Sequence, residues 1–485
     1  MEPEPESFSC GRLPPEMWQT VLSHLPQSTT PECLFVCRLF HDLAARLLFA
    51  TVRIEFGSWK LMCGVDDNTP EGEIGRRSSC LLLRIITDPI FASYVKHLYV
   101  LVFANRDVAF ELCCLTKAIS ALHNLRTFAW YTDSDPSERA IVPDNEHLET
   151  LASTCVHLCE YDLPMDSLNE LQAVKRLPAT NVALYSTRRE PIWDFDVTYD
   201  NYHWDFASLL EARKGSLTRL TAPGQAVWDC PIHTLQGLTH LTITDARRLS
   251  NITLLFHHCE RLEYLHIVLN DDPPDLFAAL AADPAALPRL THFKLYTPPA
   301  NPAGLDALAG FLRTKKRLRC LDYSDGEASD IEDMAPVISA IQSLPTLEVL
   351  GLHIALHVNG PAQFDALKSA IPASVTALSV VLDYSDLDES CSWIEVWTGL
   401  PMLAFAYVDY DRDHPMMDML ELATATRSLK LVGQRSRFYE VQRAEDGVTL
   451  SQPWSLTKTE FRTAADFGCE DWEWLMRDLF PGRDY

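Results

Sequence analysis

The most regular feature of the chain is a short segment with apolar side chains at its first, fourth and sixth positions. Apolar residues two positions apart are typical of a β-strand with one buried face. The segment recurs between residues 95 and 431, and its first positions are Val95, Leu125, Leu158, Leu217, Leu238, Leu262, Leu290, Leu318, Leu347, Val375, Leu400 and Thr426. Helix-like stretches separate the later segments, at residues 251–258, 275–282, 305–313, 333–343, 362–370 and 416–425. The pattern therefore predicts strands that alternate with helices.

The spacing of these segments indicates the kind of repeat. From Leu217 onward the first positions are 21 to 29 residues apart, which is the period of a leucine-rich repeat. Such a unit buries its apolar face only against its neighbours, so the units stack into a solenoid. We expect an α/β fold with parallel strands on the concave face and helices on the convex face. The repeats are degenerate, and the period is lost after about residue 435.

The N-terminal stretch follows a helical pattern instead. Pro14, Pro15 and Glu16 suit the first turn of a helix, where proline costs no hydrogen bond and an acidic side chain meets the helix dipole. The apolar face that follows consists of Met17, Val21, Leu22 and Leu25. Two more helical stretches follow, at residues 31–39 and 40–49. Helices this short cannot bury all of this surface against each other, so the surplus must face either the next domain, as a cap, or a partner.

The same stretch resembles the F-box family motif in the order and spacing of its residues. The matching positions are Leu13, Pro14, Glu16, Met17, Val21, Leu22, Leu25, Pro26, Leu34, Val36, Cys37, Arg38, Phe40, Leu43 and Ala44. The resemblance implies a docking surface for the Skp adaptor of SCF ubiquitin ligases, which contain Skp, a cullin and an F-box protein. The residues expected to bind the adaptor are Leu13, Pro14, Met17, Val21, Leu22, Leu25, Pro26, Leu34, Val36, Cys37, Phe40 and Leu43.

The resemblance and the repeats together imply a substrate-recognition subunit of such a ligase. The F-box would dock on the Skp adaptor and, through it, join the cullin, while the solenoid would capture a protein substrate. The alternative is a repeat scaffold that acts outside a cullin ligase. The domains expected from the sequence are an F-box at residues 11–50, a linker and solenoid entry at 51–90, the solenoid at 91–435 and a C-terminal cap at 436–485.

Charge narrows the class of partner. The chain has 41 basic and 67 acidic residues, and its formal net charge is 41 − 67 = −26. A surface this acidic repels nucleic-acid phosphates and anionic lipids, so neither nucleic acid nor a membrane is an expected partner. The first residues do not have the pattern of a signal peptide. We therefore expect a cytoplasmic or nuclear protein, not a secreted one, with reduced cysteines.

Motifs for catalysis or metal binding are not recognisable in the sequence. It contains no nucleophile elbow, no glycine-rich phosphate loop and no zinc-protease motif. The closest cysteine pairs are Cys33/Cys37, Cys113/Cys114 and Cys155/Cys159. None has a second pair at zinc-site spacing. We therefore expect no catalytic residue, no cofactor, no metal and no enzymatic activity.

One group of side chains is a candidate for substrate binding. Equivalent positions of neighbouring parallel strands lie about 4.8 Å apart. The third repeat position then aligns His240, Tyr264 and His292, and the fifth aligns His266 with Lys294. These positions alternate with the leucines, so we expect them on the concave face. They form either an ordinary polar strand surface or a docking surface for an acidic or phosphorylated segment of the substrate.

Overall fold

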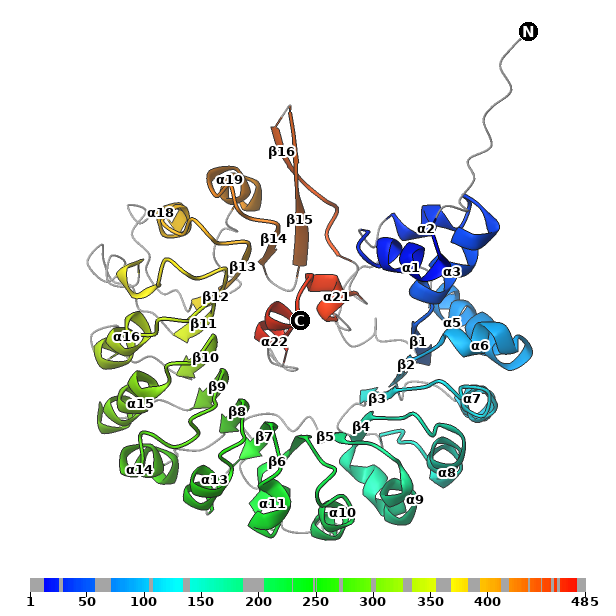
Figure 1. Ribbon diagram of the computed structural model, residues 1–485, viewed down its shortest axis with the longest axis horizontal. Helices are drawn as coiled ribbons and strands as arrows, with labels where there is room; N and C mark the ends of the chain where they lie inside the picture. The colour runs from blue at the N-terminus through cyan, green and yellow to red at the C-terminus, as the bar shows by residue number, and fades with distance from the viewer. Residues whose placement is uncertain are drawn as a thin grey trace. The chain divides into compact units, whose positions relative to one another are not determined.

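The chain forms two compact units, Met1–Asp205 (unit 1) and Phe206–Tyr485 (unit 2). The computed structural model (Figure 1) describes residues 13–25, 29–56, 71–103, 108–133, 140–185, 205–228, 230–246, 249, 251–269, 274–297, 302–325, 334–354, 368–382, 393–410, 418–434, 437–445, 447–454, 458–459 and 463–477. Within these ranges, none of the helices has the length and apolar character of a transmembrane span.

Unit 1 begins with three helices and continues with strands that alternate with helices. Its elements are α1 (Pro15–Ser23), α2 (Thr30–Cys33), α3 (Arg38–Leu48), β1 (Thr51–Phe56), α5 (Glu71–Thr87), α6 (Pro89–Tyr94), β2 (His97–Phe103), α7 (Ala109–Ile119), β3 (Thr127–Asp133), α8 (Asn145–Thr154), β4 (Glu160–Pro164), η2 (Met165–Glu170), α9 (Leu171–Arg176) and β5 (Asn181–Tyr185). Strands β1 to β5 pair in chain order, and each pair is parallel.

Unit 2 continues the alternation and ends in a short antiparallel part and two helices. Its elements are α10 (Phe206–Ala212), β6 (Arg219–Pro223), α11 (Gly224–Trp228), α12 (Ile232–Leu235), β7 (His240–Ala246), α13 (Ile252–His258), β8 (Tyr264–Leu269), α14 (Pro274–Ala282), β9 (His292–Thr297), α15 (Pro302–Thr314), β10 (Cys320–Asp325), α16 (Ala335–Gln342), β11 (Val349–Ile354), β12 (Ala377–Leu382), α18 (Trp393–Thr398), β13 (Phe405–Tyr410), α19 (Met419–Ala425), β14 (Leu431–Gln434), β15 (Arg437–Ala444), β16 (Gly447–Leu450), α21 (Ala464–Phe467) and α22 (Glu470–Met476). Strands β6 to β14 are parallel, and β15 and β16 are antiparallel.

Leucine positions of the repeat form the core between the sheet and the helices of unit 2. In the repeat that contains β9, Leu290, Phe293 and Leu295 are all buried. Helices α13 to α16 lie along this side of the sheet (Figure 1), which we call the helix side, and the opposite side is the strand side. The predicted α/β solenoid is thus confirmed: parallel strands pair in chain order, with helices on one side.

The structure corrects the register of the last two parallel repeats. Strand β13 pairs with β12 so that Phe405 takes the third position, and the repeat therefore begins at Leu403 rather than at Leu400. By the same argument, β14 belongs to a repeat that begins at Leu429 rather than at Thr426. Near β13 the apolar residues fit the pattern at both offsets, so the sequence did not distinguish them.

Several elements were not expected from the pattern. Strands β1, β5, β15 and β16 have no predicted counterpart, and β5 was missed because its repeat begins with Ala179 instead of a larger side chain. The helix predicted at 362–370 lies mostly outside the described residues. The predicted bounds of the linker (51–90), the solenoid (91–435) and the C-terminal cap (436–485) stay predictions.

The C-terminal helices of unit 2 lie on the strand side, against β9 to β13 (Figure 1). The residues between them and the sheet form a second apolar core, which consists of Cys320, Val349, Ala377, Phe405, Tyr407, Leu431, Phe438, Trp454, Phe467, Trp474, Leu475 and Met476. We call residues 463–477 the C-terminal segment. From β10 onward the third repeat position is apolar, and an apolar column on an open sheet face would cost free energy in water. The C-terminal segment removes that cost.

Lys294 joins the sheet to this segment. Its side chain is 1% exposed, and its Nζ lies 3.0 Å from Asp322 Oδ2, a carboxylate that is itself fully buried. The same Nζ donates to the carbonyl oxygens of Trp474, Leu475 and Arg477 at 3.0, 3.1 and 2.7 Å. These carbonyls stand at the end of α22, where a helix leaves carbonyl groups without partners. A buried lysine thus satisfies both a carboxylate and a helix end.

We predict that the Lys294→Met variant is strongly destabilised. Methionine has a similar volume but leaves the buried Asp322 carboxylate without the ammonium that balances it. Removal of one partner of a buried pair costs about 3–5 kcal/mol. Chemical denaturation followed by tryptophan fluorescence measures this loss, since Trp454, Trp472 and Trp474 report on the segment.

Lys315→Met is the matched control. Lys315 is equally buried, but its Nζ donates to neutral groups, the Pro284 carbonyl at 2.9 Å and the Thr314 hydroxyl at 3.0 Å. Burial lowers the pKa of Lys315 to about 8. Its removal leaves neutral groups, so we expect a smaller loss of about 1–3 kcal/mol. Equal losses in the two variants would contradict the role given to the Lys294–Asp322 pair.

Candidate functional site

The three N-terminal helices form a small bundle in which α1 and α2 both pack on α3. Leu22 of α1 and Leu43 of α3 are buried. The rings of Trp18 and Phe40 meet edge to face, with their centroids 4.9 Å apart. Leu22 and Leu43, both predicted to bind an adaptor, therefore lie in the core of the bundle, where they hold its helices together.

The other side of α1 exposes a row of apolar side chains. Met17, Val21 and Leu25 are exposed, and so is Leu13, which precedes the helix. Met17 and Val21 are four residues apart, so they lie on one face of α1, and Leu25 follows two residues after the helix ends. Contiguous apolar side chains in water are typical of an interaction surface.

A second exposed apolar pair lies between α2 and α3. Phe35 is 87% exposed and Val36 is 60% exposed. Val36 was predicted as an adaptor-binding residue, whereas Phe35 was not. The sequence offered a signal, because Phe35 stands among apolar neighbours at a helix end, but the family motif does not single out this position.

The remaining predicted residues of the bundle are less exposed or lie outside the description. Pro14 is exposed, while Leu34, Cys37 and Phe40 are half-buried. Pro26 lies outside the described residues. The exposed part of the predicted set is thus Leu13, Pro14, Met17, Val21, Leu25 and Val36, and with Phe35 we call it the apolar face of the bundle.

Contacts within unit 1 attach the bundle to the first repeat. The rings of Phe49 and Phe91 are 4.9 Å apart, and the guanidinium of Arg84 lies 4.2 Å from the centroid of the Phe91 ring. The amides of Lys96 and His97, at the start of β2, both donate to the carbonyl of Ala50 at 2.8 and 2.9 Å. The bundle is therefore held against the repeats rather than carried on a free linker.

On the strand side of unit 2, the strand register brings the predicted aromatic column together. His240 pairs with Tyr264, and Tyr264 pairs with His292. Their rings are stacked, and both centroid distances are 3.8 Å. Arg219 of β6 precedes His240 in the same column. The fifth position likewise pairs His266 with Lys294, so the predicted side-by-side arrangement is present.

Exposure divides these five predicted residues into two sets. His240 and Tyr264 are half-buried, whereas His266, His292 and Lys294 are buried. The sequence led us to expect all five on an open face. The difference arises because the C-terminal segment covers β9 and its neighbours, so the carboxylate and carbonyl groups next to His292 and Lys294 belong to the same chain.

Burial also determines the charge of the two histidines in the column. It lowers the pKa of His240 to about 3, so this imidazole is neutral at physiological pH. It lowers the pKa of His292 as well. Asp471 Oδ1 lies 3.1 Å from His292 Nε2, and Asp471 Oδ2 accepts a hydrogen bond from Arg319 Nη2 at 2.8 Å. The permanent positive charge of the open part of the column is that of Arg219.

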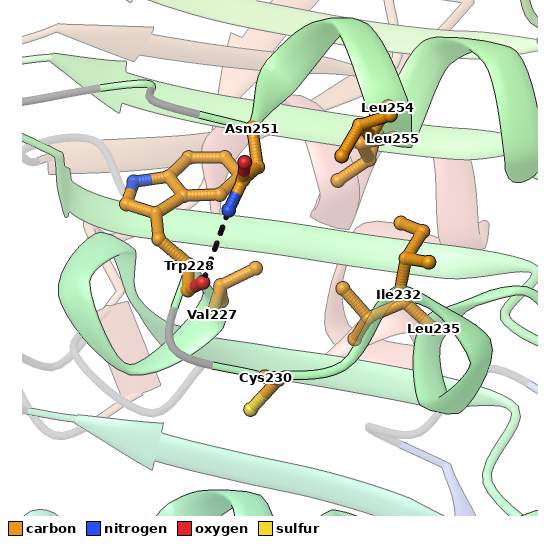
Figure 2. A pocket seen from close by; sticks show the side chains of 8 residues that line it. All are labelled: Val227, Trp228, Cys230, Ile232, Leu235, Asn251, Leu254 and Leu255. Carbon is orange, nitrogen blue, oxygen red and sulfur yellow. Dashed lines mark hydrogen bonds between the residues drawn. The ribbon is translucent and has the colours of Figure 1, made fainter.

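A small pocket lies on the helix side of unit 2 (Figure 2). It has a volume of about 100 Å³ and is lined by Val227, Trp228, Cys230, Ile232, Leu235, Asn251, Leu254 and Leu255. The Asn251 side-chain amide, the main polar group of the lining, already donates a hydrogen bond to the Trp228 carbonyl at 3.3 Å (Figure 2). Ligand sites usually measure about 300–1,000 Å³ and contain converging polar groups. The pocket does not have the features of a small-molecule site.

Comparison with protein families identifies the N-terminal bundle. The family model of the F-box domain matches residues 11–50. A search of curated proteins found no match.

Solved structures share the repeat architecture only loosely. The chain is similar to the leucine-rich repeat-containing protein LegL7 from Legionella pneumophila, with 12% identity over 77% of this chain and 98% of that one, at a TM-score of 0.32. It is also similar to a chain of the Rad7 and Elc1 complex in yeast, with 13% identity over 74% of this chain and 96% of that one, at a TM-score of 0.38. These scores support no inference about function, so the assignment rests on the family match and on the repeats themselves. The chain carries an F-box domain at residues 11–50, followed by a solenoid of the leucine-rich-repeat type.

Proposed function

We propose that the protein is the substrate-recognition subunit of an SCF-type ubiquitin ligase. Its F-box docks on a Skp adaptor, the adaptor joins it to a cullin, and the solenoid holds a protein substrate in the cytoplasm or nucleus. The observation that carries the proposal is the apolar face of the bundle, which lies inside the segment that matches the F-box family. The subunit makes and breaks no bond; it acts by raising the local concentration of the substrate.

The energetics of the apolar face support a stable complex. Burial of one large apolar side chain contributes about 1.5–3 kcal/mol. Association itself costs about 4–15 kcal/mol in lost freedom of motion. The six apolar side chains are between 38% and 87% exposed, so each contributes less than full burial would. Together they offset a cost at the lower end of this range, whereas any one of them does not. The apolar face can therefore supply part of the binding free energy of an adaptor complex.

A repeat scaffold that binds the adaptor outside a cullin ligase uses the same apolar face. The two functions differ only in whether a cullin joins the complex. The attachment of the bundle to the first repeat is compatible with both functions. This attachment consists of the Phe49, Phe91 and Ala50 contacts.

For substrate capture, we propose the open part of the strand side. Arg219 is exposed, and the rings of His240 and Tyr264 stack beside it. Arginine and tyrosine are common among the residues that dominate protein interfaces, because they combine contact area with directed hydrogen bonds. Arg219 supplies the charge for an acidic segment of the substrate, since His240 is neutral. A contribution of His266, His292 and Lys294 to substrate binding stays a prediction.

The first test of the proposal is binding of a Skp adaptor to the full-length chain. We expect the natural chain to co-purify with the adaptor and the Met17→Ala, Phe35→Ala double variant to bind at least about 30-fold more weakly, which corresponds to about 2 kcal/mol. Both side chains are exposed, so the variant should fold normally. Binding is measured by co-expression and by titration of the purified proteins.

The matched control is Phe110→Ala, which removes another phenylalanine that is 78% exposed but lies in α7, outside the F-box. This variant should bind the adaptor like the natural chain. Failure of the natural chain to bind any Skp adaptor, or equal binding by the double variant, would refute the F-box part of the proposal. An adaptor complex that never includes a cullin would support the scaffold instead.

The capture surface is tested by the Arg219→Glu variant. Charge reversal at the open end of the column should lower the recovery of substrate at least about 30-fold and leave adaptor binding unchanged. Quantitative mass spectrometry of proteins bound to cullin-containing complexes measures this. Arg289→Glu makes the same charge change at an exposed position outside the column. If both variants lose the same proteins, or neither does, Arg219 has no specific role.

A further inference from the structure

Three side chains with metal-binding atoms meet where the C-terminal segment covers the sheet. They are His292 of β9, Cys320 of β10 and Asp471 of α22. One ligand atom from each, an imidazole nitrogen, a thiol sulfur and a carboxylate oxygen, lies within 4.8 Å of the other two. Among the described residues, this is the one group of three or more His, Cys, Asp or Glu side chains that meets this condition.

The strand register creates half of this cluster. His292 and Cys320 are directly paired across β9 and β10, so their side chains leave the strand side next to each other. The third ligand, Asp471, follows 151 residues after Cys320, since 471 − 320 = 151. Both strand residues are buried, and Asp471 is 21% exposed at its side chain. The cluster is thus largely shielded from bulk water, and Asp471 is its most exposed member.

Groups around the cluster orient the ligands. The second nitrogen of the histidine, His292 Nδ1, is 2.9 Å from the Thr291 hydroxyl. The second oxygen of the carboxylate, Asp471 Oδ2, is 2.8 Å from Arg319 Nη2, and Arg319 is itself held by Glu348 at 2.8 Å. Hydrogen bonds that fix the far atoms of a histidine and a carboxylate are characteristic of metal sites.

One arrangement of the Thr291 hydrogen bonds is compatible with a cation between the ligands. The Thr291 hydroxyl donates to the Glu263 carbonyl at 3.1 Å, and a hydroxyl has only one proton to donate. In that arrangement His292 Nδ1 must be the donor to Thr291, so Nε2 of the neutral ring presents a lone pair. This lone pair faces the Asp471 carboxylate at a distance of 3.1 Å. A positive ion between two such acceptors removes the repulsion.

The preceding repeat shows the same side-chain arrangement without a carboxylate. The Thr239 hydroxyl donates to the Thr218 carbonyl at 3.1 Å and is 2.8 Å from His240 Nδ1. Its neighbour in the column is Tyr264, whose ring stacks on His240. The Thr–His pair is therefore common to both repeats, while the thiol and the carboxylate occur together only at His292 in the described column.

We propose that His292, Cys320 and Asp471 bind one zinc ion, which ties the C-terminal segment to strands β9 and β10. A thiolate with an imidazole and a carboxylate suits zinc, whereas magnesium and calcium prefer oxygen ligands alone. The charges balance: the 2+ ion meets one thiolate, one carboxylate and a neutral imidazole. Cys320 releases its proton to solvent on binding. The fourth position is taken by water.

This site extends the proposed function without depending on it. Zinc would hold the C-terminal segment over the strand side and so determine how much of the aromatic column a substrate can reach. Loss of the metal would weaken the segment but would leave the F-box, which is in unit 1, intact. Failure of the zinc test therefore says nothing against adaptor binding, and the reverse also holds.

The experiment uses the full-length chain purified without chelators. We expect about one zinc per chain by elemental analysis and release of about one proton per zinc when the metal-free protein is reloaded at neutral pH. Replacement of zinc by cobalt should give the absorption bands of a tetrahedral site with a cobalt–thiolate bond. The Cys320→Ala and Asp471→Asn variants should each lose at least about tenfold in affinity.

Cys259→Ala is the matched control, because Cys259 is equally buried but has no part in the cluster. It should bind zinc like the natural chain. Circular dichroism checks that each variant folds, and Cys320→Ser serves as a second variant at that position. The proposal is overturned if the natural chain gives no cobalt–thiolate band on loading with cobalt. It is equally overturned if the folded Cys320 variants keep the natural affinity, or if zinc binds without proton release.

Discussion

In-register pairing of parallel strands is the constraint on which the rest of this structure depends. Because each of the parallel strands β6 to β14 meets its neighbour at the same repeat position, side chains that are 21 to 29 residues apart in the sequence form straight columns on the sheet. One set of columns is the leucine core. The other set, at the third and fifth positions, carries the stacked rings, the Lys294–Asp322 pair and the strand half of the metal cluster.

The chemistry of the third column changes along the solenoid, and this change explains the C-terminal segment. From β6 to β8 the column is polar and aromatic, and water can solvate it. From Cys320 onward it is apolar as far as Leu431, so it needs a cover. The chain supplies that cover itself with α21 and α22, and Lys294 at the boundary between the two parts holds the end of α22. The C-terminal segment thus leaves Arg219, His240 and Tyr264 accessible at the third position of β6 to β8.

The F-box and the strand side use apolar surface in opposite ways. On the strand side, apolar side chains are covered by residues of the same chain and contribute to its stability. On the bundle, Met17, Val21 and Phe35 remain in water although Leu22 and Leu43 complete an adequate core behind them. The apolar side chains of the strand side are thus covered within the chain, whereas those of the bundle are exposed. The contrast is a stronger argument for docking than the exposure of any single residue.

The sequence by itself determined the parts that rest on local periodicity and on a contiguous motif. The repeat positions, most helices and the F-box are of this kind, because each depends on side chains that are close in the chain or one repeat apart. Even the columns of His240 and His266 followed from the period alone. The first position of the repeat that contains β13 did not follow from the period, because the apolar residues around Leu403 fit two registers equally well. Only the pairing of β13 with β12 selects one of them.

Tertiary structure alone decided what is exposed and what meets across long separations. The sequence indicated that Lys294 and His292 lie on the strand side, but not that residues 463–477 cover them, because no periodic signal connects a C-terminal helix to a strand about 180 residues earlier. For the same reason, the sequence did not predict that Asp471 lies next to Cys320. The exposure of a side chain and its place in a cluster depend on which elements pack together. A periodic pattern along the chain indicates only on which side of its own element a residue lies.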